Sequence, residues 1–277
     1  MWTNSGWPGR SIPANTPAGQ ELVAYSALVS AVEGNTTFYA LPSRQTAARW
    51  DGLTPDDFRF MFKFQRTVTH DRKLRGADDQ VAEFFDALEP CLPKMHPVAI
   101  QLPASFGPRD LDVLGTFLDG LPSVVRYAVE VRHPDFFDGG QTERRLNDML
   151  FAADADRIIL DSRAVFAGPR VTPAEHEAFD NKPRLPVRAV ATNDTPVVRF
   201  IGQTAAEANP GYWEPWVETT ARWLRDGRSP IVFLHTPDNV AAIDMARSFY
   251  EDVRALVPTL PPLPNAPAVS EPSLFEQ

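Results

Sequence analysis

Short runs that favour β-strands recur along the chain, and most of them end in a polar or charged residue. Segments in which apolar residues recur at helical spacing separate these runs, so predicted strands and helices alternate. Such alternation is typical of a parallel α/β fold. Eight runs match the strand count of a TIM-type (β/α)8 barrel, whose chemistry gathers at the carboxyl ends of the strands. The predicted strands lie at 3–5, 32–35, 60–63, 99–101, 128–132, 158–161, 197–199 and 231–235.

Helical periodicity predicts outer helices between these strands. In residues 78–88 the apolar positions Val81, Phe84, Phe85 and Leu88 fall on one stripe. The other predicted helices cover 20–32, 43–50, 109–118, 143–152, 215–224 and 240–256. A length of 277 residues suits one barrel, so we assign residues 1–257 to a single domain. Residues 164–196 read as a long irregular insertion, which is usually functional or mobile, and residues 258–277 as a proline-rich tail.

Residue parity predicts which side chains meet inside the barrel, because side chains alternate between the two faces of a strand. In residues 128–132, Val129 and Val131 suit the helix layer, which turns Glu130 and Arg132 toward the mouth. Three acidic and three basic side chains would then share a buried space, which is costly unless they pair or meet a ligand. The other side chains predicted to point inward are Glu33, Asn35, Lys63, Gln101, Asp161, Arg163, Arg199 and His235.

This set of side chains suggests acid–base catalysis of the isomerase or hydrolase type. The predicted catalytic residues are Glu33, Glu130, Asp161 and His235, with His235 as the proton carrier because histidine titrates near neutrality. Lys63, Arg132 and Arg199 would hold a small anionic or sugar-like substrate. The predicted binding site also includes Asn35, Gln101, His70, Trp7 and Tyr39.

Two other interpretations of the same residues stay open. Each carboxylate could form an ion pair with an arginine that only closes the barrel. Alternatively, the four predicted catalytic residues could bind a divalent metal, although the interleaved Arg132 and Arg199 count against this. No cofactor is predicted, because the sequence has no glycine-rich phosphate loop, serine-hydrolase motif, zinc signature or nucleotide fingerprint.

The composition limits the classes of binding partner and the cellular location that we expect. A net charge of −9 and a pI near 5.1 argue against broad binding to nucleic acid or an anionic membrane. The single cysteine, Cys91, excludes an intrachain disulfide and fits a reducing compartment. No stretch approaches the ~20 apolar residues of a membrane span, and the N-terminus lacks a signal-peptide pattern. We therefore expect a cytoplasmic protein.

Several motifs resemble one known family along nearly the whole chain. The motifs are residues 32–42 (VEGNTTFYALP), 58–64 (FRFMFKF), 69–70 (TH), 101–103 (QLP), 128–133 (AVEVRH), 159–163 (ILDSR), 198–202 (VRFIG) and 234–238 (LHTPD). On these residues the chain resembles the YecE-like family, also called domain of unknown function 72. The resemblance implies a TIM-type barrel, related in shape to sugar isomerases and to metal-dependent endonucleases. The family's reaction is not established, so the resemblance assigns no catalytic residue.

The C-terminal end suggests different functions. Ser273-Leu274-Phe275 resembles the end of the short peptide with which bacterial proteins dock on the DNA-polymerase sliding clamp. A second hypothesis is therefore a DNA-associated, endonuclease-like enzyme tethered by its tail. A third is a non-catalytic metabolite-binding protein that signals through the 164–196 insertion.

Overall fold

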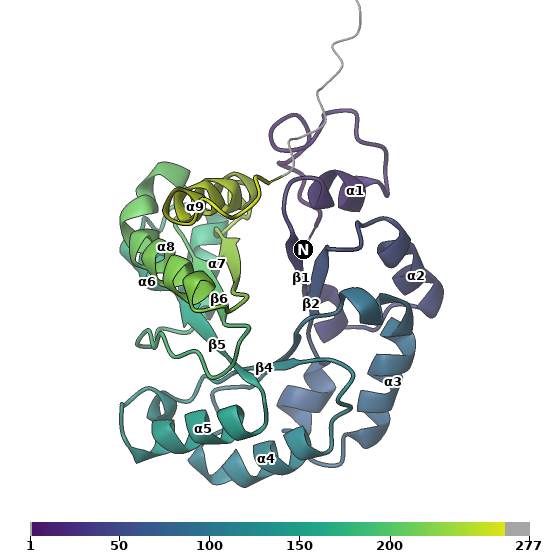
Figure 1. Cartoon of the computed structure of the whole chain (residues 1–277), viewed down its shortest axis with the longest axis vertical. Coiled ribbons are helices and arrows are strands. Elements are labelled where there is room, and N and C mark those ends of the chain that lie inside the picture. The colour runs from purple at the N-terminus through teal and green to yellow at the C-terminus, as the bar shows by residue number, and fades with distance from the viewer. Residues whose placement is uncertain (1, 264–277) are drawn as a thin grey trace, which may run out of the picture.

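Short parallel strands and the helices between them make up residues 2–263, the part of the chain that this computed structural model describes (Figure 1). The strands in this part are β1 (Ala31–Gly34), β2 (Arg59–Phe62), β3 (Val98–Gln101), β4 (Tyr127–Glu130), β5 (Asp156–Asp161), β6 (Val197–Ile201) and β7 (Ile231–His235). The helices are α1 (Glu21–Ser26), α2 (Arg44–Gly52), α3 (Asp78–Leu88), α4 (Leu111–Asp119), α5 (Gln141–Ala152), α6 (Arg163–Ala167), α7 (Pro173–Asn181), α8 (Pro210–Arg225) and α9 (Ala242–Leu256). The predicted helix at 78–88 is confirmed as α3.

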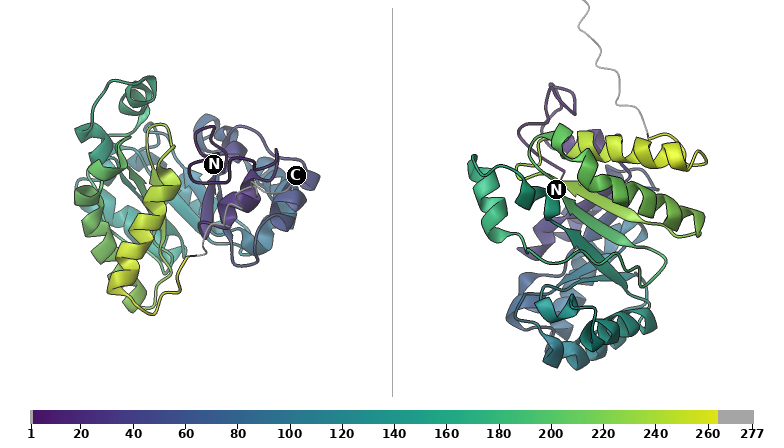
Figure 2. Two further views of the ribbon diagram at one scale, coloured as in Figure 1. Left: turned by 90° about the horizontal axis from the view of Figure 1, so that it is seen from above. Right: turned by 90° about the vertical axis from the view of Figure 1, so that its left-hand side faces the viewer.

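The strands belong to two parallel sheets. Strands β3 to β7 pair in chain order, and β1 pairs with β2. Isolated bridges from Phe60 to Met95 and from Lys63 to Ala99 connect β2 with the β3 region. Among the described residues, β1 and β7 do not pair, and each is the edge of its sheet. Figure 2 shows these two edge strands and their helices from two further sides.

The prediction of a closed eight-stranded barrel is therefore wrong, because residues 2–263 contain seven strands in sheets of five and two. The predicted first strand, residues 3–5, is not formed, and the chain instead makes a turn at residues 4–7. Asn4 accepts a hydrogen bond from the Gly6 amide at 2.8 Å and donates one to the Asp238 carbonyl at 2.8 Å. A Thr-Asn-Ser run has no apolar face to bury, and asparagine disfavours strands, so its polar groups stabilise a turn.

One layer of apolar side chains fills the space between the strands. Each strand contributes at least one residue to it: Ala31, Met61, Ala99, Ala128, Ile158, Val197, Ile231 and Phe233. Small alanines and larger side chains share this layer, as in the packed interior of a barrel. Two residues further along, the same face bears a polar side chain on every described strand except β5, where Leu160 stands at this position. These polar side chains, next to the apolar layer, form the candidate site.

The opposite face of the strands packs on the helices. Phe60, Phe62 and Phe64 are fully buried in the largest core cluster, which extends to α3 and α4. Around β6 and β7 a second cluster contains Trp213 and Trp216 of α8 together with Phe249 of α9. The predicted alternation along residues 58–64 is confirmed, because Met61 lies in the interior layer.

The 164–196 insertion is more regular than predicted, since it contains α6 and α7. Thr172 and Glu175 form a capping box at the start of α7, and Pro173 occupies its first turn. The Ser162 hydroxyl donates to the Pro183 carbonyl at 2.7 Å, and the Thr204 hydroxyl donates to Glu175 at 2.8 Å. These contacts hold the segment over the carboxyl ends of β5 and β6.

Candidate functional site

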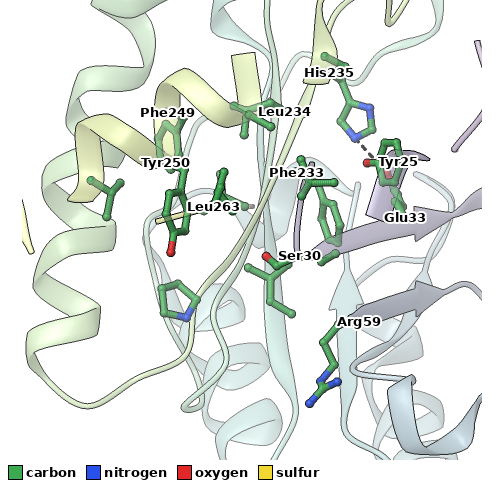
Figure 3. Close-up of a pocket in the computed structure, with 18 of the residues that line it drawn as sticks. Tyr25, Ser30, Glu33, Arg59, Phe233, Leu234, His235, Phe249, Tyr250 and Leu263 are labelled. Atoms are coloured by element: carbon green, nitrogen blue, oxygen red, sulfur yellow. Dashed lines mark ion pairs between the residues drawn. The ribbon is translucent and has the colours of Figure 1, made fainter. Parts of the chain in front are cut away.

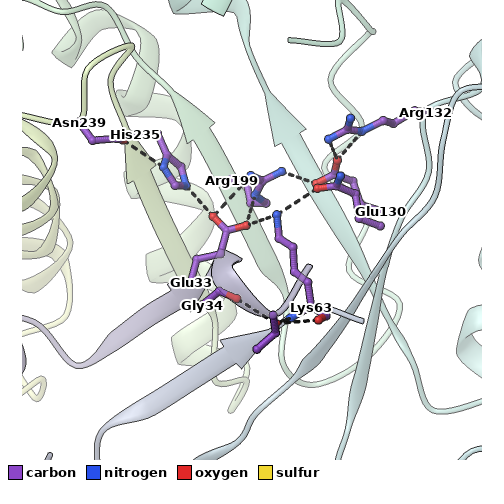
Figure 4. A network of polar contacts seen from close by, with 10 residues as sticks. Glu33, Gly34, Lys63, Glu130, Arg132, Arg199, His235 and Asn239 are labelled. Atoms are coloured by element: carbon purple, nitrogen blue, oxygen red, sulfur yellow. Dashed lines mark hydrogen bonds and ion pairs between the residues drawn. The ribbon is translucent and has the colours of Figure 1, made fainter. Parts of the chain in front are cut away.

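Glu33, at the carboxyl end of β1, is the centre of a buried charged cluster (Figure 4). One carboxylate oxygen lies 2.6 Å from Lys63 Nζ and 3.0 Å from Arg199 Nε, and the other lies 3.0 Å from His235 Nε2. The Glu33 side chain is 1% exposed. One carboxylate thus connects residues that follow β2 or belong to β6 and β7.

Arg199 links this carboxylate to a second one. Its Nη1 donates to Glu130 at the end of β4, and Arg132 Nη2 lies 2.6 Å from the other oxygen of Glu130. Lys63 Nζ also donates to Gln101 Oε1 at 3.0 Å. The structure therefore brings together seven of the predicted site residues from six strand ends: Glu33, Lys63, Gln101, Glu130, Arg132, Arg199 and His235.

Both carboxylates are held in the ionised form. Burial opposes ionisation of Glu33, but Arg199 and Lys63 hold its pKa well below the usual range. Burial likewise opposes ionisation of Glu130, yet Arg199 and Arg132 bring its pKa down to about 2. At neutral pH, neither carboxylate has a proton to donate.

Within the cluster, the groups whose pKa values lie closest to neutrality are Lys63 and His235, two of the partners of Glu33. Burial, with repulsion from Arg199, lowers the pKa of Lys63 to about 8. Burial also lowers the pKa of His235 below the usual 6.5, although Glu33 opposes this shift. His235 Nε2 lies 3.0 Å from a Glu33 oxygen, which only accepts, so a neutral His235 has its proton on Nε2. Its Nδ1 lies 3.3 Å from Asn239 Oδ1, and it accepts a hydrogen bond there only when the Asn239 amide is turned so that the NH2 group faces the ring.

Asp161 is not part of this cluster, which corrects the predicted inward orientation. Ile158 points into the interior layer, so Asp161, three residues along β5, points to the helices. Its carboxylate accepts from Trp216 Nε1 of α8 at 2.7 Å and pairs with Arg163 at 2.7 Å. Asp161 therefore anchors the start of α6, and Arg163 is engaged in the same contact.

The remaining predicted site residues lie around the cluster. His70 packs edge-on against Phe38 with ring centroids 5.1 Å apart, and burial and Arg132 lower its pKa. Tyr39 is 81% exposed beside Phe38. Trp7 is buried, donates to the Asn239 carbonyl at 3.0 Å and, like Asn35, lines a cavity beside Glu33.

Sequence reasoning missed Lys182, which directly follows α7. Its side chain is exposed, and the charges of Arg199, Glu33 and Glu130 act on it. The Lys182 ammonium makes no ion pair with another residue in the range 2–263. Recognition of the Thr172-Pro173-x-Glu175 capping box would have predicted α7, but only the fold of the chain brings its end over the strand ends.

Most of the cluster is closed to solvent, and a few side chains remain accessible. Arg132 and His235 have side chains that are 22% and 18% exposed, while those of Lys63 and Arg199 are below 10%. Two carboxylates face four cations when Lys182 is counted with Lys63, Arg132 and Arg199, which leaves a surplus of two positive charges. Such a surplus attracts anions.

The metal alternative has little support in this geometry. In residues 2–263 no group of three or more His, Cys, Asp or Glu side chains is arranged to hold a metal ion. The Arg199 guanidinium lies between Glu33 and Glu130, where a cation would have to bind both carboxylates.

None of the helices within residues 2–263 has the length and apolar character that a membrane span requires.

Fold and site define an α/β protein whose parallel strands converge on a buried, positively biased charged cluster. Residues 1–268 match the model of the family described as "Protein of unknown function DUF72", and the chain belongs to this family. The resemblance inferred from the sequence motifs is thus confirmed.

Relatives and solved structures agree with this assignment. The chain is 40% identical to the UPF0759 protein YecE of Escherichia coli K12 over 275 residues, which cover 99% of this chain and 97% of the relative. A DUF72 family protein of Thermotoga maritima has a similar fold, with a TM-score of 0.68 and 20% identity over 93% of this chain and 96% of its own. Another, from Enterococcus faecalis, gives a TM-score of 0.65 and 17% identity over 86% and 94%.

The proposed clamp-binding residues Ser273, Leu274 and Phe275 lie outside the described residues. At its other end, the predicted tail begins with packed residues. Leu263 is buried, and Leu260 packs on the cluster formed by α8 and α9.

Proposed function

We propose that this protein is an enzyme that binds a small anionic substrate at the carboxyl ends of its strands and transfers protons with His235 and Lys63. The observation that carries the proposal is the position of Glu33, which holds one of these groups on each carboxylate oxygen. A general base and a general acid are most effective when their pKa values lie near the working pH.

The two groups have complementary protonation states. With a pKa below 6.5, His235 is mainly neutral at pH 7 and accepts a proton through its nitrogen beside Asn239. With a pKa of about 8, Lys63 is mainly protonated and donates one. Glu33 stabilises the positive charge that forms on His235, as a carboxylate beside a catalytic histidine does.

Anion binding follows from the surplus positive charge. Lys182 is exposed and Arg132 is partly accessible beside the cluster, and Arg132 presents a planar guanidinium that suits carboxylate or phosphate groups. Because Lys182 has no ion-pair partner among the described residues, its replacement should weaken binding without leaving a buried carboxylate unpaired.

Binding is tested with a Lys182→Ala variant and calorimetric titration of inorganic phosphate and small carboxylates. Arg184→Ala is the matched control, since Arg184 is an exposed cation two residues further on that stacks over Phe166. The variant should lose roughly tenfold to a hundredfold in anion affinity, in the range of one charge-assisted hydrogen bond, while the control should not. Equal affinities for both variants would place the anion elsewhere.

Catalysis is tested by incubating small carboxylates and phosphate esters with the protein in D2O and following deuterium incorporation by NMR. The wild-type rate should fall at acidic pH as His235, whose pKa lies below the usual 6.5, gains a proton, and above about pH 8 as Lys63 loses one. A His235→Asn variant should abolish incorporation. Anion binding without any incorporation would instead favour a non-catalytic binding protein, an interpretation that the closed cluster also supports.

A further inference from the structure

The gap between the edge strands β1 and β7 contains a cavity of about 360 Å³ (Figure 3). It extends from Trp7, Glu33 and His235 near the strand ends to Ser30 and Arg59 near the strand starts. An eighth strand would occupy this position in a closed barrel. The turn at residues 4–7 replaces this strand and leaves the position open. The cavity volume lies within the range of small-molecule sites.

Apolar side chains make up most of the wall. Leu234 and Phe233 come from β7, and Phe249 and Val253 from α9, while Leu263 lies at the end of the described chain. A cavity with such a lining loses dispersion contacts when it is unfilled, which costs stability. An apolar ligand would restore these contacts.

The charged groups in the wall lie at its two ends. Glu33 contacts Lys63 and His235, and the Arg59 guanidinium donates to the Asp56 and Phe58 carbonyls. Asp57 is exposed at the far end. A charged group in the apolar middle of the cavity would lose its hydration without gaining a counter-ion.

One polar group in the wall lacks a partner. Thr220 of α8 is 5% exposed, and its hydroxyl oxygen is buried with no hydrogen-bond partner in the described part of the chain. Buried hydroxyl groups in proteins are nearly always hydrogen-bonded. The Thr220 hydroxyl oxygen is closed to solvent, so a rotation of the side chain about its Cα–Cβ bond is needed to bring it to the cavity surface. There a ligand that carries its own hydroxyl or carbonyl group would satisfy it.

We propose that the cavity between β1 and β7 binds an uncharged, mainly aliphatic molecule whose single hydroxyl or carbonyl group hydrogen-bonds to Thr220. This site is separate from the anion site, although Glu33 and His235 lie between the two. It does not depend on the proposed catalysis, and the two proposals can fail independently.

The test uses 1-hexanol and hexylammonium, two probes of equal chain length that differ in charge, with binding followed by calorimetry and NMR saturation transfer. The wild-type protein should bind 1-hexanol and not hexylammonium. Thr220→Val, which keeps the side-chain shape, should weaken 1-hexanol roughly fivefold, the value of one neutral hydrogen bond. Thr219→Val, a neighbouring threonine outside the cavity wall, is the matched control and should bind like the wild type.

A second variant tests the position of the site. Ala246 of α9 lines the cavity, so Ala246→Phe should fill it and abolish 1-hexanol binding while phosphate binding stays unchanged. Equal binding of both probes, or unchanged 1-hexanol binding by Ala246→Phe, would overturn the proposal. Binding of 1-hexanol only after removal of residues 264–277 would also overturn it, because the chain's own tail would then be the occupant.

Discussion

Asp156 provides the sharpest test of the electrostatics inside the strand layer. It is the first residue of β5, shares its face with Ile158 and is 0% exposed. Neither carboxylate oxygen has a hydrogen-bond partner of regular geometry in residues 2–263. Burial raises its pKa to about 7, although Arg126 opposes the shift.

This shift makes folding stability depend on pH. Because the folded state retains the proton up to about pH 7 and the unfolded chain releases it near pH 4, the folded state binds more protons in between. The free energy of unfolding therefore decreases as the pH rises from 4 to 7, and Asp156 has no further effect above this window. Between pH 5 and pH 8 the loss amounts to about 3 kcal/mol.

Asp156→Asn removes this ionisation. The variant should be more stable relative to the wild type at pH 8 than at pH 5, by about 3 kcal/mol, as measured by urea unfolding. Comparing the two pH values cancels the constant cost of burying an amide. Asp148→Asn, at an exposed position of α5, is the control and should show no such difference. If Asp156→Asn and wild type lose stability in parallel from pH 5 to pH 8, the burial and protonation assigned to Asp156 are incorrect.

Three further predictions concern the cluster, the insertion and the thiol. Arg199→Met leaves two buried carboxylates without their shared partner and should cost about 3–5 kcal/mol in urea unfolding, whereas Glu218→Gln on the exposed face of α8 should cost little. Thr172→Ala removes the capping box of α7 and should lower the free energy of unfolding by about 1 kcal/mol. Backbone hydrogen exchange should become faster only in residues 172–182, and faster exchange over the whole chain would contradict this. Burial raises the pKa of the Cys91 thiol to about 12. Iodoacetamide at pH 8 should therefore leave Cys91 unmodified in the folded protein and modify it in urea, and rapid labelling of the folded protein would refute its burial.

Local sequence was enough to predict which side chains form the cluster on most strands. Along β2 the alternation of Phe60 and Phe62 with Met61 turns Lys63 inward, and the same two-residue period works for Glu130 and Arg199. On β5 the alternation of side chains did not predict the orientation of Asp161 correctly. Residues 158–160 are all apolar, so the sequence gives no indication of which face of this strand points inward. The packing of Ile158 in the interior settles this and turns Asp161 outward.

The sequence by itself determined the order of strands and helices, the family and most of the charged residues at the strand ends, because these follow from short periodic patterns. Tertiary structure alone decided that Arg199 lies between two carboxylates, that Lys182 lies beside them and that β1 and β7 do not pair. The physical reason is the distance along the sequence over which each kind of interaction acts. Alternation and capping act over a few residues, whereas ion pairing, pKa shifts and sheet closure depend on groups that are distant in the sequence and meet only in the folded chain.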